Sequence, residues 1–462
     1  MSVIVANGAT AGSRGSASLA LTCYLGLFLL LNTFALNSFL SSVSPAAYSE
    51  TVLNHTSDVI NAEGCDDSWG IMAYALQYER TPHTVPLYTE LFFKRKLKFQ
   101  YPPSSLFTIA AMLWLAGPEL VRTAECPDFE FASLNDVLGW LFILISAVST
   151  AVLLERGLRR HFMAPTSSVL FSVRTVIVFG FALTFYPIVK AFTLGQIQIL
   201  LTGIFALALL CWAFGWKGSS GVLIGLMCLV KPHYGLFVLW AALRREWRFT
   251  VACVAMMAIG LAASIATFGW ADNVDYLGVF WFLSQHGEVY YPNQSFNGLF
   301  NRLMTLIDPE AYNSLEFDDY GFPPFNPWIY AGTLSTSLVI LSAALFRRGR
   351  EGDPDRTLDF CTMALSITIA SPIAWEHHYG ILLPVFAVLL ASSLGNRTRL
   401  VLIAVSYVLI SNFFSIANMF ALTILNVVQS YVFFAALVVL ILLHRARLGG
   451  KIGEPPSAPA LP

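Results

Sequence analysis

The sequence predicts an all-α polytopic membrane protein. Of its 462 residues, 56% are hydrophobic and only 12% are charged, whereas a soluble domain is about half apolar and about a quarter charged. The apolar residues gather in long runs, and a helix needs roughly 20 such residues to cross a bilayer. The formal net charge of -1 gives no bias toward polyanions, so nucleic acid is not expected as a partner.

The predicted spans follow one another along most of the chain. The first run, 19–40, is longer than the apolar core of a signal peptide, so we expect a retained first span. Further spans are predicted at 137–154, 168–190, 197–214, 249–268, 327–346, 380–394, 400–414 and 429–443. The runs 104–121 and 220–243 contain Gly117-Pro118 and Lys231-Pro232, so each is a short span, a broken helix or a re-entrant hairpin. Together these runs predict about 10 to 13 transmembrane or re-entrant helices.

Arginine clusters indicate the orientation, because basic residues beside spans favour the cytoplasmic side. All the clusters fall on one side if 220–243 enters and returns as a pair of short helices. The clusters are Arg156/Arg159/Arg160, Arg244/Arg245/Arg248, Arg347/Arg348/Arg350, Arg397/Arg399 and Arg445/Arg447. The resulting parts are a cytoplasmic tail (1–18), a single transmembrane domain (19–446) with exterior loops 41–103 and 269–325, and a Pro-rich cytoplasmic tail (447–462). The first exterior loop is long and directly follows the first span.

Three segments at the exterior side carry residue types suited to catalysis or binding. Cys65-Asp66-Asp67-Ser68-Trp69 holds two carboxylates, for which the plain alternative is a solvated acidic turn or a helix N-cap. Phe99-Gln100-Tyr101-Pro102-Pro103 fixes an extended backbone where the loop re-enters the bilayer. Trp375-Glu376-His377-His378-Tyr379 follows the helix break at Ser371-Pro372. Its paired histidines can bind a metal or a phosphate, or anchor a helix at the interface.

Polar residues also occur at membrane depth, where an ionisable group is costly and points to function. Lys231 stands within an apolar stretch, and the alternative is a lysine that snorkels to an interface. Gly195-Gln196, with Gln198, opens an apolar helix whose unpaired amides suit an anion. The basic run Lys94-Arg95-Lys96-Leu97-Lys98 in the first exterior loop contacts either lipid headgroups or an anionic carrier.

Taken in order, these motifs resemble the polyprenol-phosphate-mannose-dependent mannosyltransferases of the GT-C superfamily, in particular the α-1,2-mannosyltransferases of phosphatidylinositol mannoside synthesis. The set comprises Asp66/Asp67, Pro86-Leu87-Tyr88, Tyr101-Pro102-Pro103, Gly195-Gln196, Lys231-Pro232, Arg244-Arg245-Glu246-Trp247-Arg248, Asn293-Gln294-Ser295 with Arg302, Ser371-Pro372 and His377-His378. The resemblance runs from about residue 60 to about residue 395. One departure is that the acidic residue usually follows the first span closely, whereas here more than twenty residues intervene, and Asp58 lies among them as a rival carboxylate.

The resemblance implies a GT-C fold and an inverting transfer of a sugar, first of all mannose, from a polyprenyl-phosphate donor to a lipid or glycan acceptor. It implies Asp67 as general base and Asp66 as an orienting neighbour. The implied donor-phosphate ligands are Lys231, His377, His378 and Arg302, and the implied sugar or acceptor ligands are Gln196, Asn293, Gln294 and Tyr101. We expect a monomer in a bacterial inner membrane, with its site facing the extracytoplasmic side. We assign no cofactor and no metal ligands, and metal dependence stays open because the acidic pair and the histidines are far apart in the sequence.

The main alternative from another class is a secondary transporter or lipid flippase, and a structural membrane subunit is a third. Transporters often show internal repeats and binding sites at the midplane, and we find no convincing repeat in the sequence. An enzyme should instead gather its polar residues at the exterior end of the spans.

The cysteines give one further expectation. Cys65 and Cys126 lie in predicted exterior loops, whereas the other cysteines lie in apolar runs. Because disulfides persist in oxidising compartments, we predict a bridge that holds the acidic loop 122–136 against the segment of Asp66 and Asp67.

Overall fold

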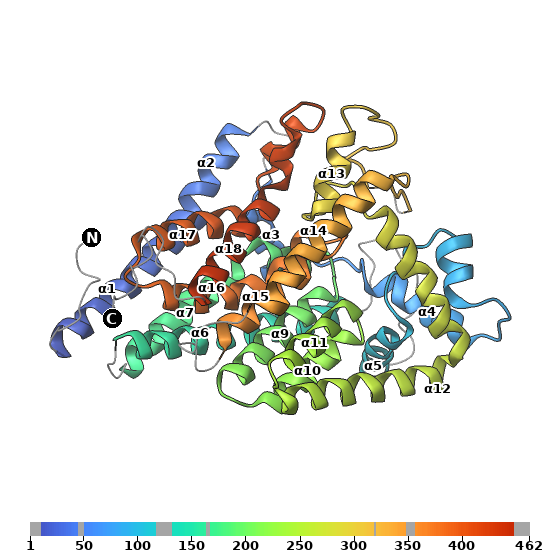
Figure 1. Ribbon diagram of the computed structural model, residues 1–462. Helices are drawn as coiled ribbons and strands as arrows, with labels where there is room; N and C mark the ends of the chain where they lie inside the picture. The colour runs from blue at the N-terminus through green and yellow to red at the C-terminus, as the bar shows by residue number, and fades with distance from the viewer. Residues whose placement is uncertain are drawn as a thin grey trace, which may run out of the picture.

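The protein is helical throughout the part of the chain that the structure describes. The computed structural model describes residues 11–44, 50–116, 132–162, 167–317, 320–347 and 356–447. In these ranges every regular element is a helix, apart from an isolated β-bridge between Asn293 and Trp375. The all-α prediction is therefore confirmed for these residues, which Figure 1 shows as helices packed side by side.

Five helices among the described residues are long and apolar enough to cross a bilayer. The first, Gly15–Val43, joins α1 (Ala11–Leu30), the π-helical turn η1 (Leu31–Ala35) and α2 (Leu36–Val43). The others are formed by α6 (Ala132–Phe162), α12 (Trp247–His286), α14 (Pro327–Phe346) and, over Asn426–Arg447, by α18 (Tyr431–Arg447) with the short turn before it. A sixth span results if α7 (Ser168–Leu183) and α8 (Tyr186–Thr193) are taken together across their 57° bend. The chain is thus a multi-pass integral membrane protein.

The larger total of about 10 to 13 segments stays a prediction, because several remaining apolar helices are shorter than a span. They include Pro103–Leu115, which contains η4 (Pro103–Ser105) and α5 (Leu106–Ala116) in part, α9 (Gln198–Ala213), Pro232–Leu243 and α15 (Thr357–Ala370). No predicted run covered α15. It has only 14 residues, with Asp359 in its first turn, and all of its residues are buried. The apolar side chains of α15 therefore pack inside the protein core.

The run 220–243 forms a hairpin of two short helices. Its elements are α10 (Lys217–Cys228), the 3-10 turn η6 (Pro232–Gly235) and α11 (Leu236–Leu243). Pro232 has no N–H to extend α10, so Lys231 lies at the turn. At the far end of the hairpin, Trp240 of α11 packs on Trp212 of α9 with ring centroids 5.1 Å apart. Lys231 and the arginines after α11 consequently lie at opposite ends of these helices.

Helix α12 connects the hairpin to the second predicted exterior loop. Figure 1 shows it beneath α10 and α11 and then turning to rise beside α4 (Trp69–Arg80). The bend is at Gly269, whose φ of 84° is a conformation that glycine adopts without strain. The first part of the predicted loop 269–325 is therefore helical, and α13 (Phe296–Met304) follows.

The first predicted exterior loop, 41–103, also contains helices. They are α3 (Val52–Asn61), α4 and the π-helical turn η3 (Thr89–Lys94). Two aspartates of α12 hold this segment: Asp272 accepts from the N–H of Leu87 at 2.7 Å, and Asp275 accepts from the N–H of Thr89 at 2.7 Å. The two predicted exterior segments thus pack against each other.

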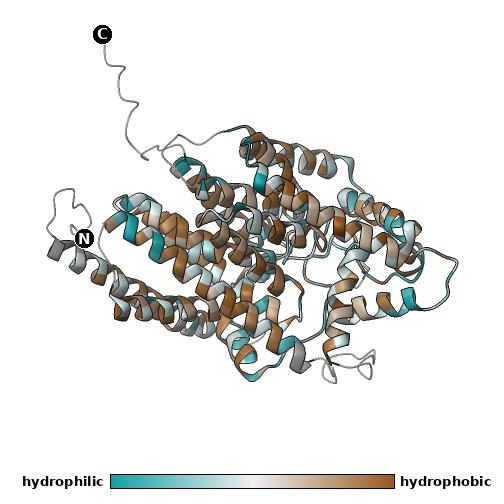
Figure 2. Ribbon diagram, turned by 90° about the horizontal axis from the view of Figure 1, so that it is seen from below, coloured by the Kyte–Doolittle hydropathy of each residue, from teal (hydrophilic) through white to brown (hydrophobic). Residues whose placement is uncertain are grey.

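The remaining elements complete the bundle. They are η7 (Glu376–Ile381), α16 (Leu382–Ser393), α17 (Arg397–Ser411), η8 (Ser415–Phe420) and η9 (Asn426–Ser430). Figure 2 shows hydrophobic residues along most of the helices. Large apolar side chains such as Val176, Val251 and Val339 are 65–71% exposed, a pattern that suits lipid contact rather than water.

Candidate active site

A cavity of about 900 Å³ brings together residues from both predicted exterior segments and from the broken helices. Its polar and charged lining includes Asp67, Lys98, Tyr101, Lys190, Gln196, Lys231, Glu376, His377 and His378. Its apolar lining includes Leu236, Phe280, Leu283, Leu341 and Ile367. Two carboxyl groups, several basic side chains and apolar helices in one cavity suit an amphiphilic, anionic ligand.

Asp67 reaches the cavity because its segment pairs with the chain between α8 and α9. The N–H groups of Cys65, Asp67 and Ser68 donate to the carbonyls of residues 193–195, at 2.8, 3.0 and 3.3 Å. Trp69 then begins α4. Asp67 is therefore fixed by its own backbone at the point where two segments distant in sequence meet.

Gly195 makes this close approach possible. It has a φ of +63°, and a Cβ placed on it would lie 1.8 Å from the carbonyl oxygen of Cys65. That contact is with backbone, which cannot rotate away as a side chain could. A side chain at this position would therefore displace the segment that carries Asp67.

A hydrogen-bond network orients the amide that contacts Asp67. The Gln196 Nε2 group donates to the Asp67 carboxylate. The other end of the amide is held by the Ser68 hydroxyl, which donates to Gln196 Oε1 at 2.9 Å, and the Tyr101 hydroxyl lies 3.1 Å from Ser68 Oγ. These contacts fix which end of the Gln196 amide faces the carboxylate.

The two neighbouring aspartates differ in environment. Solvent reaches Asp67 through the cavity, yet protein surrounds the cavity, and this enclosure raises the pKa of its carboxyl above the ordinary value. The hydrogen bond from Gln196 acts in the opposite direction, as do the charges of Lys98 and Lys190. Asp66 does not line the cavity; its carboxylate lies beside Gly70 in the first turn of α4. Asp67 is therefore the better placed of the pair to contact a ligand.

Lys231 and the histidines form another part of the polar lining. Lys231 Nζ donates to Gln198 Oε1 at 2.7 Å and lies 2.6 Å from His378 Nε2. Because a lysine ammonium can only donate, His378 accepts through Nε2. His377 is buried, and its Nε2 has no hydrogen-bond partner among the described residues. These groups can meet an anion in the cavity.

Three residues that the resemblance implicated lie behind the cavity lining. Arg302 is fully buried, where it donates to the carbonyl of Asn293 at 2.9 Å and to Ser430 Oγ at 2.5 Å. Gln294 Nε2 donates to the carbonyl of Gln429 at 2.7 Å. The structure thus gives these side chains protein partners, and none of Arg302, Asn293 and Gln294 lines the cavity.

Asn293 positions the segment that carries the histidines. Its Nδ2 group donates to the carbonyl of Pro372 at 3.1 Å, and its Oδ1 accepts from the N–H of Ala374 at 2.9 Å. The N–H of Glu376 donates to the carbonyl of Pro292 at 2.9 Å. This pairing holds Trp375 and the following turn η7 at the edge of the cavity.

Some lining residues were not assigned from the sequence. Lys190 lines the cavity, and its side chain has no hydrogen bond or ion pair among the described residues. In the sequence, its position shortly before Gly195 was the feature that could have indicated a place in the site. Lys98, part of the basic run, pairs with Glu288 at 2.8 Å. Glu376, inside a motif that was noted for its histidines, accepts from the Tyr186 hydroxyl at 2.9 Å. All three become close to the other site residues only through tertiary packing.

The bridge predicted between Cys65 and Cys126 stays a prediction, because Cys126 lies outside the described residues. The backbone of Cys65 is held by Thr193, as described above.

Comparison with known proteins shows which family this chain is similar to. A family model described as Glycosyltransferase family 87 matches residues 99–372. This range contains Gln196 and Lys231, whereas Asp67 and His378 lie outside it. No solved structure matches the chain.

Two similar curated proteins carry the same name, polyprenol-phosphate-mannose-dependent alpha-(1-2)-phosphatidylinositol mannoside mannosyltransferase. The protein from Mycobacterium tuberculosis is 27% identical over 322 residues, which cover 67% of this chain and 65% of the relative. The protein from Mycolicibacterium smegmatis is 24% identical over 308 residues, which cover 63% of this chain and 61% of the relative. The chain thus spans somewhat less than two thirds of the relatives it matches.

Proposed function

The chain belongs to glycosyltransferase family 87, and from that premise we propose that it transfers a sugar, in the first place mannose, from a polyprenyl-phosphate carrier to a lipid or glycan acceptor. The named relatives are polyprenol-phosphate-mannose-dependent enzymes. The observation that carries the proposal is the shared cavity, in which Asp67, the cations and apolar spans all form the lining.

In the proposed reaction Asp67 is the general base. An acceptor hydroxyl loses its proton to the Asp67 carboxylate while its oxygen forms a bond to the anomeric carbon. The bond from that carbon to the carrier phosphate breaks with inversion, and the phosphate leaves with the bonding electrons. A phosphate leaving group needs little acid catalysis, but it does need compensation of its charge in a site that excludes water.

We assign that compensation to Lys231, His378 and Lys190, which line the same cavity. His377 adjoins them, with its ring 4.8 Å from that of His378. Gln196 orients the base, and Tyr101 supports Gln196. Arg302, Asn293 and Gln294 act in this proposal by positioning the loops, since each side chain already donates hydrogen bonds to backbone carbonyls.

The apolar lining suits the carrier's isoprenoid tail. Phe280 belongs to α12 and Leu341 to α14, which are both long enough to span the bilayer. An isoprenoid lying between these helices would place its phosphate toward Lys231. This arrangement explains why the cavity combines cations with apolar side chains.

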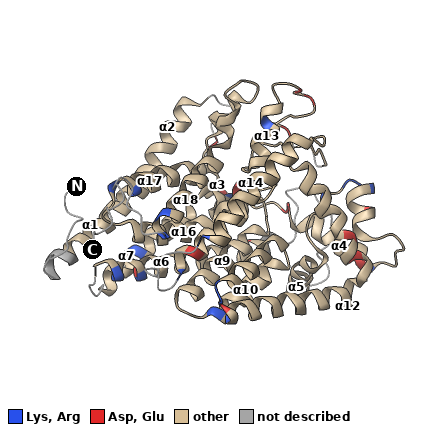
Figure 3. Cartoon of the chain, in the orientation of Figure 1, with Lys and Arg blue, Asp and Glu red and all other residues tan. Residues whose placement is uncertain are grey.

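The arginine clusters support an extracytoplasmic site. Asp359, at the start of α15, accepts from Arg244 at 2.7 Å and also from Arg447. Arg156 packs over Phe214, after the end of α9, and Figure 3 shows Lys and Arg at the ends of these helices. The cavity residues Gln196 and Lys231 lie at the opposite ends of α9 and α10 from these basic residues. If the basic residues face the cytoplasm, the cavity faces the extracytoplasmic side.

The same distribution favours an enzyme over a transporter or flippase. Asp67 and Lys98 of the lining belong to the segment that follows the first span, as expected for catalysis beneath exterior loops. A donor panel tests this reading. Purified protein should transfer sugar from polyprenyl-phosphate mannose, arabinose, galactose or glucose, with mannose preferred, but not from a nucleotide sugar. Absence of transfer from every polyprenyl-phosphate sugar would reject the proposal.

The Gly195 approach gives a second test. Gly195→Ala should reduce transfer by at least about a hundredfold, because displacement of Asp67 removes general base catalysis. Gly215→Ala is a matched control, since Gly215 also has a positive φ, +82°, but a Cβ placed on it would have no atom within 4 Å. Equal activities in the two variants, measured on protein with equal helical content, would show that the close approach is unimportant.

A further inference from the structure

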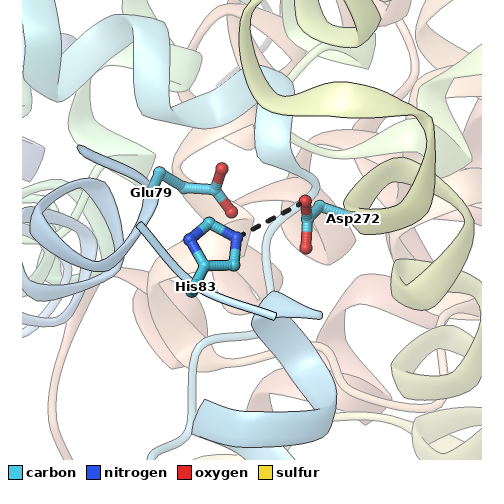
Figure 4. Close-up of side chains that lie close together, drawn as sticks. All are labelled: Glu79, His83 and Asp272. Atoms are coloured by element: carbon cyan, nitrogen blue, oxygen red, sulfur yellow. Dashed lines mark ion pairs between the residues drawn. The ribbon is translucent and has the colours of Figure 1, made fainter. Parts of the chain in front are cut away.

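A second cluster of chemically active side chains lies outside the cavity lining. Glu79 of α4, His83 after α4 and Asp272 of α12 each point a potential ligand atom toward the others (Figure 4). These three atoms all lie within 4.8 Å of one another. The cluster joins the two predicted exterior segments, which are far apart in the sequence.

The histidine is held in the tautomer that a metal ligand requires. His83 Nδ1 lies 2.8 Å from the carbonyl oxygen of Thr81. A carbonyl can only accept, so Nδ1 carries a proton and the neutral ring presents the lone pair of Nε2. That nitrogen lies 3.9 Å from Asp272 Oδ2. A backbone carbonyl that fixes one ring nitrogen while the other faces carboxylates is the usual support of a metal-bound histidine.

The burial of the two carboxylates is an independent observation that favours a cation at this site. The Asp272 side chain is only 8% exposed; its Oδ1 binds the N–H of Leu87, and its Oδ2 is directed at the cluster. Glu79 Oε1 is buried and has no hydrogen-bond partner among the described residues. Buried acidic oxygens of this kind are costly unless a cation or a proton compensates them.

We propose that Glu79, His83 and Asp272 bind a divalent transition-metal ion of the zinc class. One imidazole and two carboxylates form a nitrogen and oxygen donor set that zinc accepts at about 2.0–2.2 Å, with water completing a tetrahedral site. Two ligands of one such ion lie at most about 4 Å apart by the same distances. Shifts of roughly an ångström in the ligand atoms therefore suffice to bring all three within coordinating distance of one ion.

The ion would connect the segment after α4 to the outer part of α12, behind the cavity lining. Leu87 is already bound to Asp272, and the neighbouring Tyr88 hydroxyl donates to the carbonyl of Tyr101 at 2.5 Å. Tyr88 also packs on Tyr276, with the two ring centroids 5.4 Å apart. Both Tyr101 and Tyr276 line the cavity. The ion would thus hold these two segments together, and its existence does not depend on the proposed transfer reaction.

The test uses untagged, full-length protein in detergent, stripped with EDTA and then titrated with zinc chloride. We expect one zinc per chain by elemental analysis after gel filtration, and a rise in melting temperature on zinc addition. Cobalt substitution should give the visible absorption of a nitrogen and oxygen site. Glu79→Gln, His83→Asn and Asp272→Asn should each raise the Kd at least about a hundredfold, because loss of a direct ligand exceeds the 10–100-fold cost of losing its outer partner.

Asp275→Asn is the matched control. Asp275 lies one turn along α12 and binds the N–H of Thr89 as Asp272 binds that of Leu87, but it is not in the cluster, so this variant should keep its zinc. Glu79→Gln carries the test if Asp272→Asn fails to fold, since Glu79 Oε1 has no protein partner to lose among the described residues. No zinc in the wild type, or equal zinc affinity in Glu79→Gln and the wild type, would overturn the proposal.

Discussion

Asp67→Asn should abolish sugar transfer while leaving the fold and donor binding intact. An amide cannot take the proton of the acceptor hydroxyl, and general base catalysis contributes about 10²–10⁴-fold to a rate. The substitution keeps the size of the side chain, and the backbone of residue 67 is held independently by the carbonyl of Leu194. Transfer rate, donor affinity and helical content should be measured on the same preparation.

Asp66→Asn and Asp58→Asn are the comparison variants for this prediction, and both should retain more activity than Asp67→Asn. Wild-type turnover in Asp67→Asn, with loss in either of the other two, would move the base to another carboxylate. The pH profile gives a second measure. Because enclosure raises the pKa of Asp67, kcat/KM should fall as the pH drops through that raised value and the base becomes protonated.

Lys231→Ala should lower turnover by at least about a hundredfold, and His378→Ala should do the same. Removing one group that stabilises a developing anion costs about 10²–10³ in kcat. Lys231 and His378 lie 2.6 Å apart and line the cavity, so each loss leaves the carrier phosphate with less compensation. Turnover at saturating donor, compared with KM, shows whether the loss is in the transition state.

Lys94→Ala is the control lysine, because its side chain is 70% exposed and pairs with Glu90 outside the cavity lining. Lys231→Met removes the charge but keeps an apolar stem of similar length, which separates loss of charge from loss of packing. Wild-type rates in Lys231→Met and His378→Ala would mean that these residues only anchor the helices.

Apolar patterning predicted the class of fold well, but it is a poor guide to individual central helices. The hairpin 220–243 follows from Pro232, a local signal that ends a helix whatever its surroundings. The helix α15 gave no comparable signal, because a helix buried on all sides can be short and can carry Asp359 when Arg244 pairs with it. The exterior segments were read as loops, although contacts between α12 and residues 87–89 hold them in helical form.

The candidate site was predictable where a residue's chemistry is unusual for its place in the sequence. Asp67, Gln196, Lys231 and His378 stand out in this way, and the structure brings them to one cavity. Arg302 and Asn293 also stood out, but a buried polar residue must find partners, and theirs are backbone groups and the Ser430 hydroxyl. Lys190 and Glu376 needed tertiary structure, as did the cluster of Glu79, His83 and Asp272, because the spacing along the chain does not show which segments meet.

The central claim is that Asp67 and the cations of one cavity transfer sugar from a polyprenyl-phosphate carrier. The most direct measurement is transfer of radiolabelled mannose from polyprenyl-phosphate mannose to a phosphatidylinositol mannoside acceptor, with wild-type protein and Asp67→Asn in matched proteoliposomes. We predict labelled product from the wild type and none from the variant, although both bind the donor. Equal labelling by the two proteins, or binding of the donor by wild type without transfer to any lipid or glycan acceptor, would contradict the account.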